Sequence, residues 1–247
     1  MCLIVFAWQI LPSIPLVAAA NRDEFYARKS ATAQWWEDFP AIYAGRDLEA
    51  GGTWMGIRKD EQDFTRNRFA AITNFRAPRF LESRESSRGK LVSDFLESSL
   101  CPQEYIALIR KDAHRFNGFN LLVGKGSTLI WFSNCGYGHP RNGKPLPPGI
   151  YGLSNALLDD PWPKVIRTRA QFASLLGQGA PNEAYFEMLS CTMPAPESQL
   201  PDTGFGMDVE KALSCVRIDL PDYGTRASTL VKLFHDRQPF FDERIYY

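Results

Sequence analysis

The first 24 residues, Met1–Glu24 (MCLIVFAWQILPSIPLVAAANRDE), decide the fold of this chain. Two short apolar runs, Leu3–Trp8 and Leu16–Ala20, flank a connecting segment that contains two prolines. Apolar runs of this length, bounded by turn residues, are typical of buried strands. We therefore expect a β-hairpin. Such a hairpin brings Cys2, at the start of the first strand, close to the polar run Asn21–Glu24 after the second.

The same N-terminal segment superficially resembles a secretory leader because three alanines precede Asn21. No Lys or Arg comes before the apolar run, however, and a leader needs a positively charged start. Prolines and polar residues also interrupt the run, which argues against a membrane-spanning helix. The sequence thus predicts a cytoplasmic protein without a transmembrane segment.

Composition narrows the class of protein. The 247 residues suit one domain, 1–247, with a sizeable core. Lys plus Arg and Asp plus Glu balance at 28 each, and no basic patch for nucleic acid is visible. The five cysteines are odd in number and lack metal-ligand spacing, which favours a reducing compartment over a disulfide framework. The three histidines have no zinc spacing either, so we predict no metal site.

The rest of the chain predicts an α+β fold with antiparallel pairing, because strands come first, helices follow and strands close the chain. Apolar periodicity predicts helices over 87–100, from Pro102 onward, and over 163–176. The expected strands after the hairpin are 56–58, 69–74, 120–124, 128–134, 150–154, 213–220, 225–234 and 240–246.

Cys2 is the first candidate for chemistry. Methionine aminopeptidases remove an initiator Met before a small residue, and the chain would then begin with a thiol and a free α-amine on one residue. An α-amine titrates at roughly 7.7–8.0, so it can accept the thiol proton through a bridging water. The structural alternative is that Cys2 is an ordinary buried strand residue.

Four further residues have side chains that a cysteine acyl-transfer site needs. Asp23 can hold the α-ammonium by a charge-assisted hydrogen bond. Asn74 and Asn155 can each offer an amide NH₂ to an oxyanion, and Arg226 can lower the thiol pKa or bind a carboxylate. Each also has a structural interpretation, as a strand end, a turn cap or a surface ion pair.

Seven motifs, in order along nearly the whole chain, carry a family resemblance. They are MCLIVF, AANRDEFYAR, GGTWMGI, AAITNFR, NGFNLLVG, GIYGLSNALLDDPWPKV and YGTRAST. Together they resemble the NRDE family, also called the transport and Golgi organisation family. The resemblance implies the fold of N-terminal nucleophile hydrolases, a four-layer αββα sandwich of two stacked antiparallel sheets with helices outside.

A more distant similarity links the chain to conjugated bile salt hydrolases and penicillin V acylases, which mature to an N-terminal Cys. It implies a nucleophile at Cys2, and in their Arg-Asn-x-Asp motif it matches Asn21 and Asp23 to the asparagine and the aspartate. Their pocket asparagines and late arginine correspond to Asn74, Asn155 and Arg226. The arginine of that motif falls on Ala20, whereas this chain has Arg22 two residues later. Whether Arg22 replaces it depends on strand geometry beyond Ala20.

The resemblance leaves two functions open. The family is associated with haem trafficking, which implies a haem-binding protein that uses the hydrolase pocket for its cargo. The alternative is a cysteine hydrolase that cleaves a linear, non-peptide C–N bond in a lipid-like or small amide and requires no cofactor. Asn21, Arg22 and Trp54 are the expected ligand-binding residues, although a tryptophan beside a motif also suits a core. A weaker third option is a partner-binding protein with a vestigial pocket, and the oligomeric state stays open.

Overall fold

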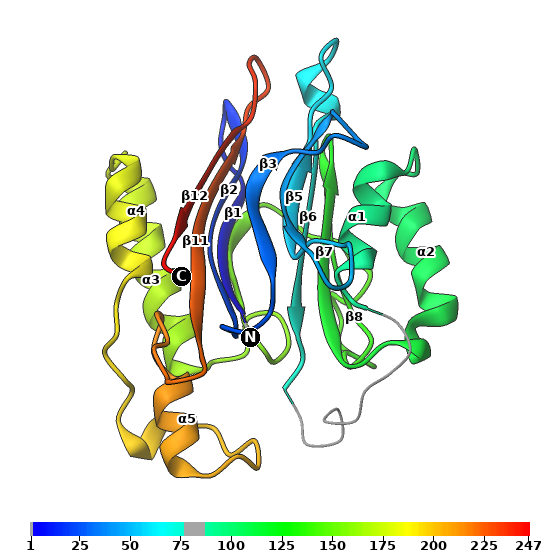
Figure 1. Cartoon of the computed structure of the whole chain (residues 1–247). Coiled ribbons are helices and arrows are strands. Elements are labelled where there is room, and N and C mark those ends of the chain that lie inside the picture. The colour runs from blue at the N-terminus through cyan, green and yellow to red at the C-terminus, as the bar shows by residue number, and fades with distance from the viewer. Residues whose placement is uncertain (1, 77–86) are drawn as a thin grey trace.

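The computed structural model describes residues 2–76 and 87–247. Two antiparallel sheets stack face to face, and helices cover their outer faces (Figure 1). The predicted α+β class and the four-layer αββα sandwich are therefore confirmed. Residue 1 lies outside the described part, and with it the expected removal of the initiator methionine.

The five-stranded sheet is built around the predicted hairpin. Its strand order is β10–β1–β2–β11–β12, and every neighbouring pair is antiparallel. The hairpin register places Cys2 opposite Arg22 and Ile4 opposite Ala20. The strands are β1 (Cys2–Leu11), β2 (Ile14–Phe25), β10 (Gly149–Leu153), β11 (Tyr223–Leu233) and β12 (Phe240–Ile245).

The seven-stranded sheet follows the chain order more simply, because its strands β3 to β9 are neighbours in sequence. Short connections suit antiparallel neighbours of this kind. These strands are β3 (Ser30–Trp35), β4 (Ile42–Asp47), β5 (Met55–Arg58), β6 (Arg68–Asn74), β7 (Phe119–Lys125), β8 (Thr128–Ser133) and β9 (Lys144–Pro145).

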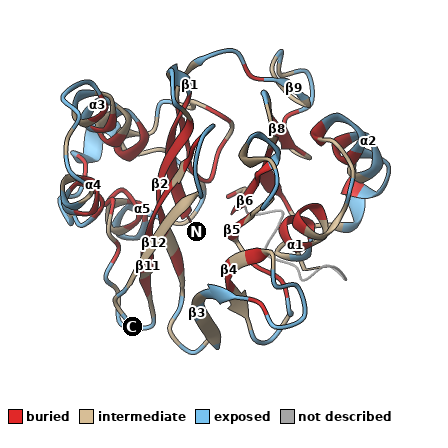
Figure 2. Cartoon of the chain, turned by 90° about the horizontal axis from the view of Figure 1, so that it is seen from above, coloured by how far each residue is buried: buried red, intermediate tan, exposed pale blue. Residues whose placement is uncertain are grey.

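Helices lie on both outer faces (Figure 2). Two of them, α1 (Lys90–Glu97) and α2 (Pro102–Asp112), pack on the seven-stranded sheet. On the five-stranded sheet lie α3 (Pro163–Gly177) and α4 (Asn182–Leu189), and α5 (Met207–Leu213) sits near one end of the same layer. Short 3₁₀ turns occur at Phe64–Arg66, Ala113–Arg115 and Glu197–Gln199.

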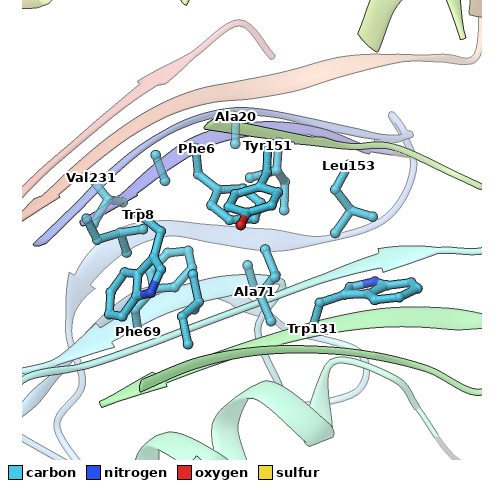
Figure 3. Close-up of a cluster of buried hydrophobic side chains, with 14 of the residues drawn as sticks. Phe6, Trp8, Ala20, Phe69, Ala71, Trp131, Tyr151, Leu153 and Val231 are labelled. Carbon is cyan, nitrogen blue, oxygen red and sulfur yellow. The ribbon is translucent and has the colours of Figure 1, made fainter. Parts of the chain in front are cut away.

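The main core lies between the sheets. Alternate residues of β1, namely Ile4, Phe6 and Trp8, belong to one buried cluster with Phe69 and Trp131 of the second sheet. Figure 3 shows Phe6 and Trp8 pointing into the space between the two sheets. The intervening residues of β1 pack against α3 and α4 in a separate cluster. Because both faces of β1 are covered, its sequence is continuously apolar instead of alternating.

One predicted strand, Leu213–Leu220, is wrong. The helix α5 ends at Leu213, and the following residues form only an isolated bridge between Asp219 and Gly224. The segment alternates like a strand, but β12 covers the same edge of β11 from Ala227 to Lys232. Only the start of that edge is left, and Asp219 pairs there with Gly224 as a single bridge.

Candidate functional site

A cavity of about 380 Å³ opens where β1 begins and β6 ends. Six of the eight residues predicted for the site line this cavity, from strands of both sheets and the connections between them. They are Cys2, Arg22, Asp23, Trp54, Asn74 and Arg226. Asn21 and Asn155 do not line it.

Cys2 lies in the wall of the cavity with only 7% of its surface exposed. Ser154 Oγ donates a 2.9 Å hydrogen bond to the Cys2 carbonyl and fixes its backbone. Burial raises the pKa of the thiol, while the backbone N–H of Asp23, hydrogen-bonded to the sulfur, lowers that pKa in part. In this buried environment the Cys2 side chain is therefore a neutral thiol and not a thiolate.

Strand geometry continues past Ala20, because β2 extends to Phe25. Ala20 and Arg22 therefore share the face that looks toward the second sheet, and Arg22 sits directly opposite Cys2. No hydrogen bond links the Arg22 guanidinium to another described residue. The displacement of the arginine by two residues thus keeps its face at the cavity wall. Burial raises the pKa of Glu243 in the same wall, and the charge of Arg22 opposes that rise.

Asn21 points to the opposite face of β2. Its amide donates two 2.9 Å hydrogen bonds to the carbonyls of Leu189 and Val216, and its oxygen accepts one of 2.5 Å from Ser228. The side chain is fully buried and saturated with partners. The structure therefore places Asn21 as a tie between the sheet and the helical layer.

Asp23 is buried at the same end of β2 and borders the cavity. Thr225 Oγ1 on β11 donates a 2.6 Å hydrogen bond to its carboxylate. Burial raises the pKa of Asp23, and the positive charge of Lys164 opposes that rise. An acidic residue thus lies at the same end of the hairpin as Cys2 and borders the same cavity.

The two candidate oxyanion residues have different positions. Asn74 ends β6 and lines the cavity, and its side-chain amide makes no hydrogen bond with another described residue. Asn155 is fully buried, and its amide donates a 2.8 Å hydrogen bond to the Asn74 carbonyl. Asn155 therefore fixes the end of β6, whereas the side-chain amide of Asn74 has no hydrogen bond to another described residue.

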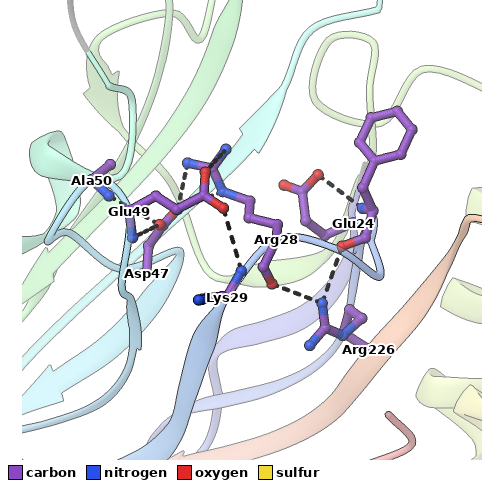
Figure 4. Close-up of polar contacts among 8 residues, drawn as sticks. Glu24, Arg28, Lys29, Asp47, Glu49, Ala50 and Arg226 are labelled. Atoms are coloured by element: carbon purple, nitrogen blue, oxygen red, sulfur yellow. Dashed lines mark hydrogen bonds and ion pairs between the residues drawn. The ribbon is translucent and has the colours of Figure 1, made fainter.

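Arg226 reaches the cavity wall but is largely committed to the backbone. Its Nη1 donates to the carbonyls of Phe25, Tyr26 and Arg28 at 3.0–3.1 Å. Figure 4 shows this guanidinium at the end of β2, with Arg28 turned to Asp47 at 2.7 Å. Arg226 thus shapes the turn after β2 that forms part of the cavity.

Sequence analysis did not single out Lys164. This lysine is in the first turn of α3, is 1% exposed, and its Nζ has no hydrogen-bond partner among the described residues. Burial lowers its pKa to about 8, and the charge of Asp23 opposes the decrease. A signal was present, since Lys164 shares a helical face with the buried Thr168 and Phe172 at spacings of four.

No histidine is among the described residues that line the cavity, and His139 packs its ring against Trp131 at 4.9 Å instead. Over residues 2–76 and 87–247, no group of three or more His, Cys, Asp or Glu side chains has metal-binding geometry. In that same part of the chain, no helix is long and apolar enough to cross a bilayer.

Comparisons with known proteins agree on one family. The sequence matches "Transport and Golgi organisation 2" over residues 1–247. It is 36% identical to the transport and Golgi organization protein 2 homologs of Bos taurus and Homo sapiens, over 99% of this chain and 92% of each relative. The Drosophila melanogaster transport and Golgi organization protein 2 is 27% identical over 98% of this chain and 91% of that protein.

Proposed function

The chain belongs to the transport and Golgi organisation 2 family, and we propose that it works as a cysteine hydrolase on a linear, non-peptide amide. The single observation that carries the proposal is the convergence of Cys2, Asp23 and Asn74 on one cavity from three different places in the sequence. A nucleophile, an anchoring acid and a neutral donor are the parts that acyl transfer requires.

The proposed reaction starts when removal of Met1 frees the α-amine of Cys2. This amine takes the thiol proton through a water, and the sulfur forms a bond to the carbonyl carbon of the substrate. The Asn74 amide donates to the oxygen that becomes negative. The C–N bond then breaks, and the amine product leaves with the proton held by the α-ammonium. Water hydrolyses the remaining thioester, releases the carboxylic acid and restores the thiol.

The cavity wall suggests the class of substrate. Arg22 has a guanidinium without a hydrogen-bond partner among the described residues, and Trp54 and Ile72 add apolar surface nearby. An amide with an apolar body and an anionic group matches this combination, because Arg is suited to paired hydrogen bonds with a carboxylate.

The test begins with an intact mass measurement of the purified native protein, which reports whether Met1 is absent. A panel of acyl amides that carry a carboxylate is then incubated with wild type, Cys2→Ala and Cys101→Ala. We expect a covalent acyl adduct and turnover in wild type and Cys101→Ala, and neither in Cys2→Ala. Turnover by Cys2→Ala, or a native chain that retains Met1, would refute the mechanism.

Haem binding in the same cavity is the second candidate function. It is favoured by the pairing of the apolar Trp54 and Ile72 with two arginines, Arg22 and Arg88, that suit the propionates of a haem. Cys2 is the cavity residue with a sulfur that haem iron accepts as a ligand. No histidine is among the described residues that line this cavity, whereas Tyr247 is, and a tyrosine also binds haem iron. Cys2 and Tyr247 are therefore the proposed axial ligands.

A haem titration separates the two candidates. We expect a saturable Soret shift in wild type that weakens in Arg22→Ala, while His139→Ala, outside the cavity, binds as wild type. Uptake that does not saturate, or that ignores Arg22→Ala, would contradict a haem site here. We also propose the cytoplasm as the location, since the five cysteines form no disulfide in the structure. Fractionation of cells with an antibody to the native chain tests it.

A further inference from the structure

Glu243 is a carboxylate of the cavity wall that neither candidate function uses. It lies on β12, the edge strand of the five-stranded sheet, and lines the same cavity as Cys2. Side chains alternate between the two faces of a strand, and the next residue, Arg244, pairs with Glu183 of α4 at 2.7 Å on the outer face. Glu243 therefore points inward, toward the seven-stranded sheet.

One carboxylate oxygen of Glu243 is fixed by the protein, and the other is not. Oε1 accepts a 2.7 Å hydrogen bond from the backbone N–H of Ala33 on β3, the edge strand of the other sheet. Oε2 has no hydrogen-bond partner among the described residues, and a Cβ on Gly45 would lie 3.7 Å from it. Gly45 has no side chain and also lines the cavity, so it leaves the space beside Oε2 to a ligand.

Among residues 2–76 and 87–247, no cation neutralises Glu243 by direct contact. Its partner across the strand pair is the neutral Thr229. The charge of Arg22 acts on the Glu243 carboxyl, but no ion pair joins these two side chains. A partly buried carboxylate in this situation is stabilised by a positively charged hydrogen-bond donor from a ligand.

Arg22 and Glu243 face the cavity from different strands of one sheet. The register across this sheet aligns four residues that all line the cavity, namely Cys2, Arg22, Ala227 and Ile245. Glu243 precedes Ile245 by two residues and shares its face, so standard sheet spacings put the Cα atoms of Arg22 and Glu243 about 12 Å apart. With both side chains directed into the cavity, a small group that carries a carboxylate and an ammonium can contact both of them.

We propose that Glu243 is a specificity-determining residue that binds an ammonium of the ligand, while Arg22 binds a carboxylate of the same group. The group is then an α-amino acid, and an acylated side-chain amine on it leaves an amide bond for Cys2. Such a subsite narrows the substrate of the proposed hydrolase function, on which it rests, to acyl amides of diamino acids.

Two probes that differ in a single group test the subsite. Nε-Hexanoyl-lysine has the carboxylate, the α-ammonium and the amide, and its deaminated analogue has hydrogen in place of the ammonium. Both dissociation constants are measured by calorimetry with full-length Cys2→Ala, in which the amide stays intact. We expect the lysine derivative to bind about tenfold more tightly or better, which is equivalent to about 1.4 kcal/mol.

Variants in the same Cys2→Ala background locate the source of this preference. Glu243→Gln should bring the two dissociation constants together, because the amide keeps the shape of the side chain and loses its charge. Asp242→Asn is the matched control, since Asp242 is the next residue on β12 and lies opposite Leu230 of the outer cluster. It removes the same charge and should keep the preference. Loss of the Ala33 contact alone would weaken both probes alike and leave their ratio unchanged.

The comparison of the two probes decides the matter even where Glu243→Gln does not fold. Equal binding of the probes by protein with Glu243 intact, or no binding of either probe, would overturn the proposal, and so would a preference that survives in Glu243→Gln. Chemistry is measured separately. A lysine derivative that binds with the expected preference but is left uncleaved by the native chain would count against the hydrolase and not against the subsite.

Discussion

The neighbours Asn21 and Arg22 give the sharpest prediction, because β2 turns them to opposite faces of the same sheet. Replacing Asn21 by Ala removes three buried hydrogen bonds, two to the carbonyls of Leu189 and Val216 and one from Ser228. Each such bond contributes about 1 kcal/mol net, and a buried group left unpaired costs more. Asn21→Ala should therefore lower the free energy of unfolding by about 3–5 kcal/mol. Arg22→Ala, which removes no hydrogen bond among the described residues, should change it by roughly 0.5 kcal/mol or less.

The assay is urea unfolding followed by tryptophan fluorescence, for which the chain has six tryptophans. With a urea slope of about 3 kcal/mol per M, the midpoint of Asn21→Ala should fall by about 1 M or more. Ser228→Ala removes one of the three bonds and should lie between wild type and Asn21→Ala. Haem or amide binding should respond in the reverse order, with Arg22→Ala the more damaged. A larger loss of stability in Arg22→Ala than in Asn21→Ala would refute the assignment of the two faces.

Three more predictions concern the walls of the site. Gly52→Ala should destabilise the chain by roughly 1–3 kcal/mol and weaken ligand binding, because a Cβ there would lie 2.5 Å from the backbone carbon of Gly89 beside the cavity; an unchanged thermal midpoint would contradict this. Arg76→Met should cost about 3–5 kcal/mol by leaving Glu210 buried and unpaired, and Arg76→Met with Glu210→Leu should regain most of it in urea unfolding. In a chain that retains Met1, alkylation of Cys2 measured by mass should keep accelerating beyond pH 9, since burial raises the thiol pKa above that value and only the thiolate reacts; a plateau near pH 8 would show an activated thiol instead.

Local sequence was sufficient where the structure depends on local pattern. The hairpin of β1 and β2 follows from two apolar runs and a turn, and the structure confirms it. Cys2 and Asp23 meet because each lies at the same end of that hairpin, which its register brings together. Asn74 joins them because it ends β6, a strand that the pattern of apolar residues also predicts.

Tertiary arrangement decided what the sequence could not show. The side of the sheet to which Asn21 points depends on the register of β2. The hydrogen bond from Asn155 to the Asn74 carbonyl depends on how the two sheets pack together. Lys164 was missed because a lysine in a helix is ordinarily solvated, and only the packing of α3 against the end of the sheet buries it. The wrong strand at 213–220 has the same origin, since β12 occupies most of the edge of β11 that such a strand would need.

The register of the hairpin determines where the arginine side chain lies relative to the cavity and to Cys2. In the hairpin, Ala20 is opposite Ile4, one full pleat inside the core between the sheets, whereas Arg22 is opposite Cys2 at the cavity. An arginine at position 20 would have to extend out of an apolar cluster before it reached the thiol, and burial of its charge would be costly. The side chain at position 22 is already at the cavity wall. The shift of two residues relative to the Arg-Asn-x-Asp pattern therefore keeps a cation on the same face of β2 and places it opposite Cys2 at the cavity.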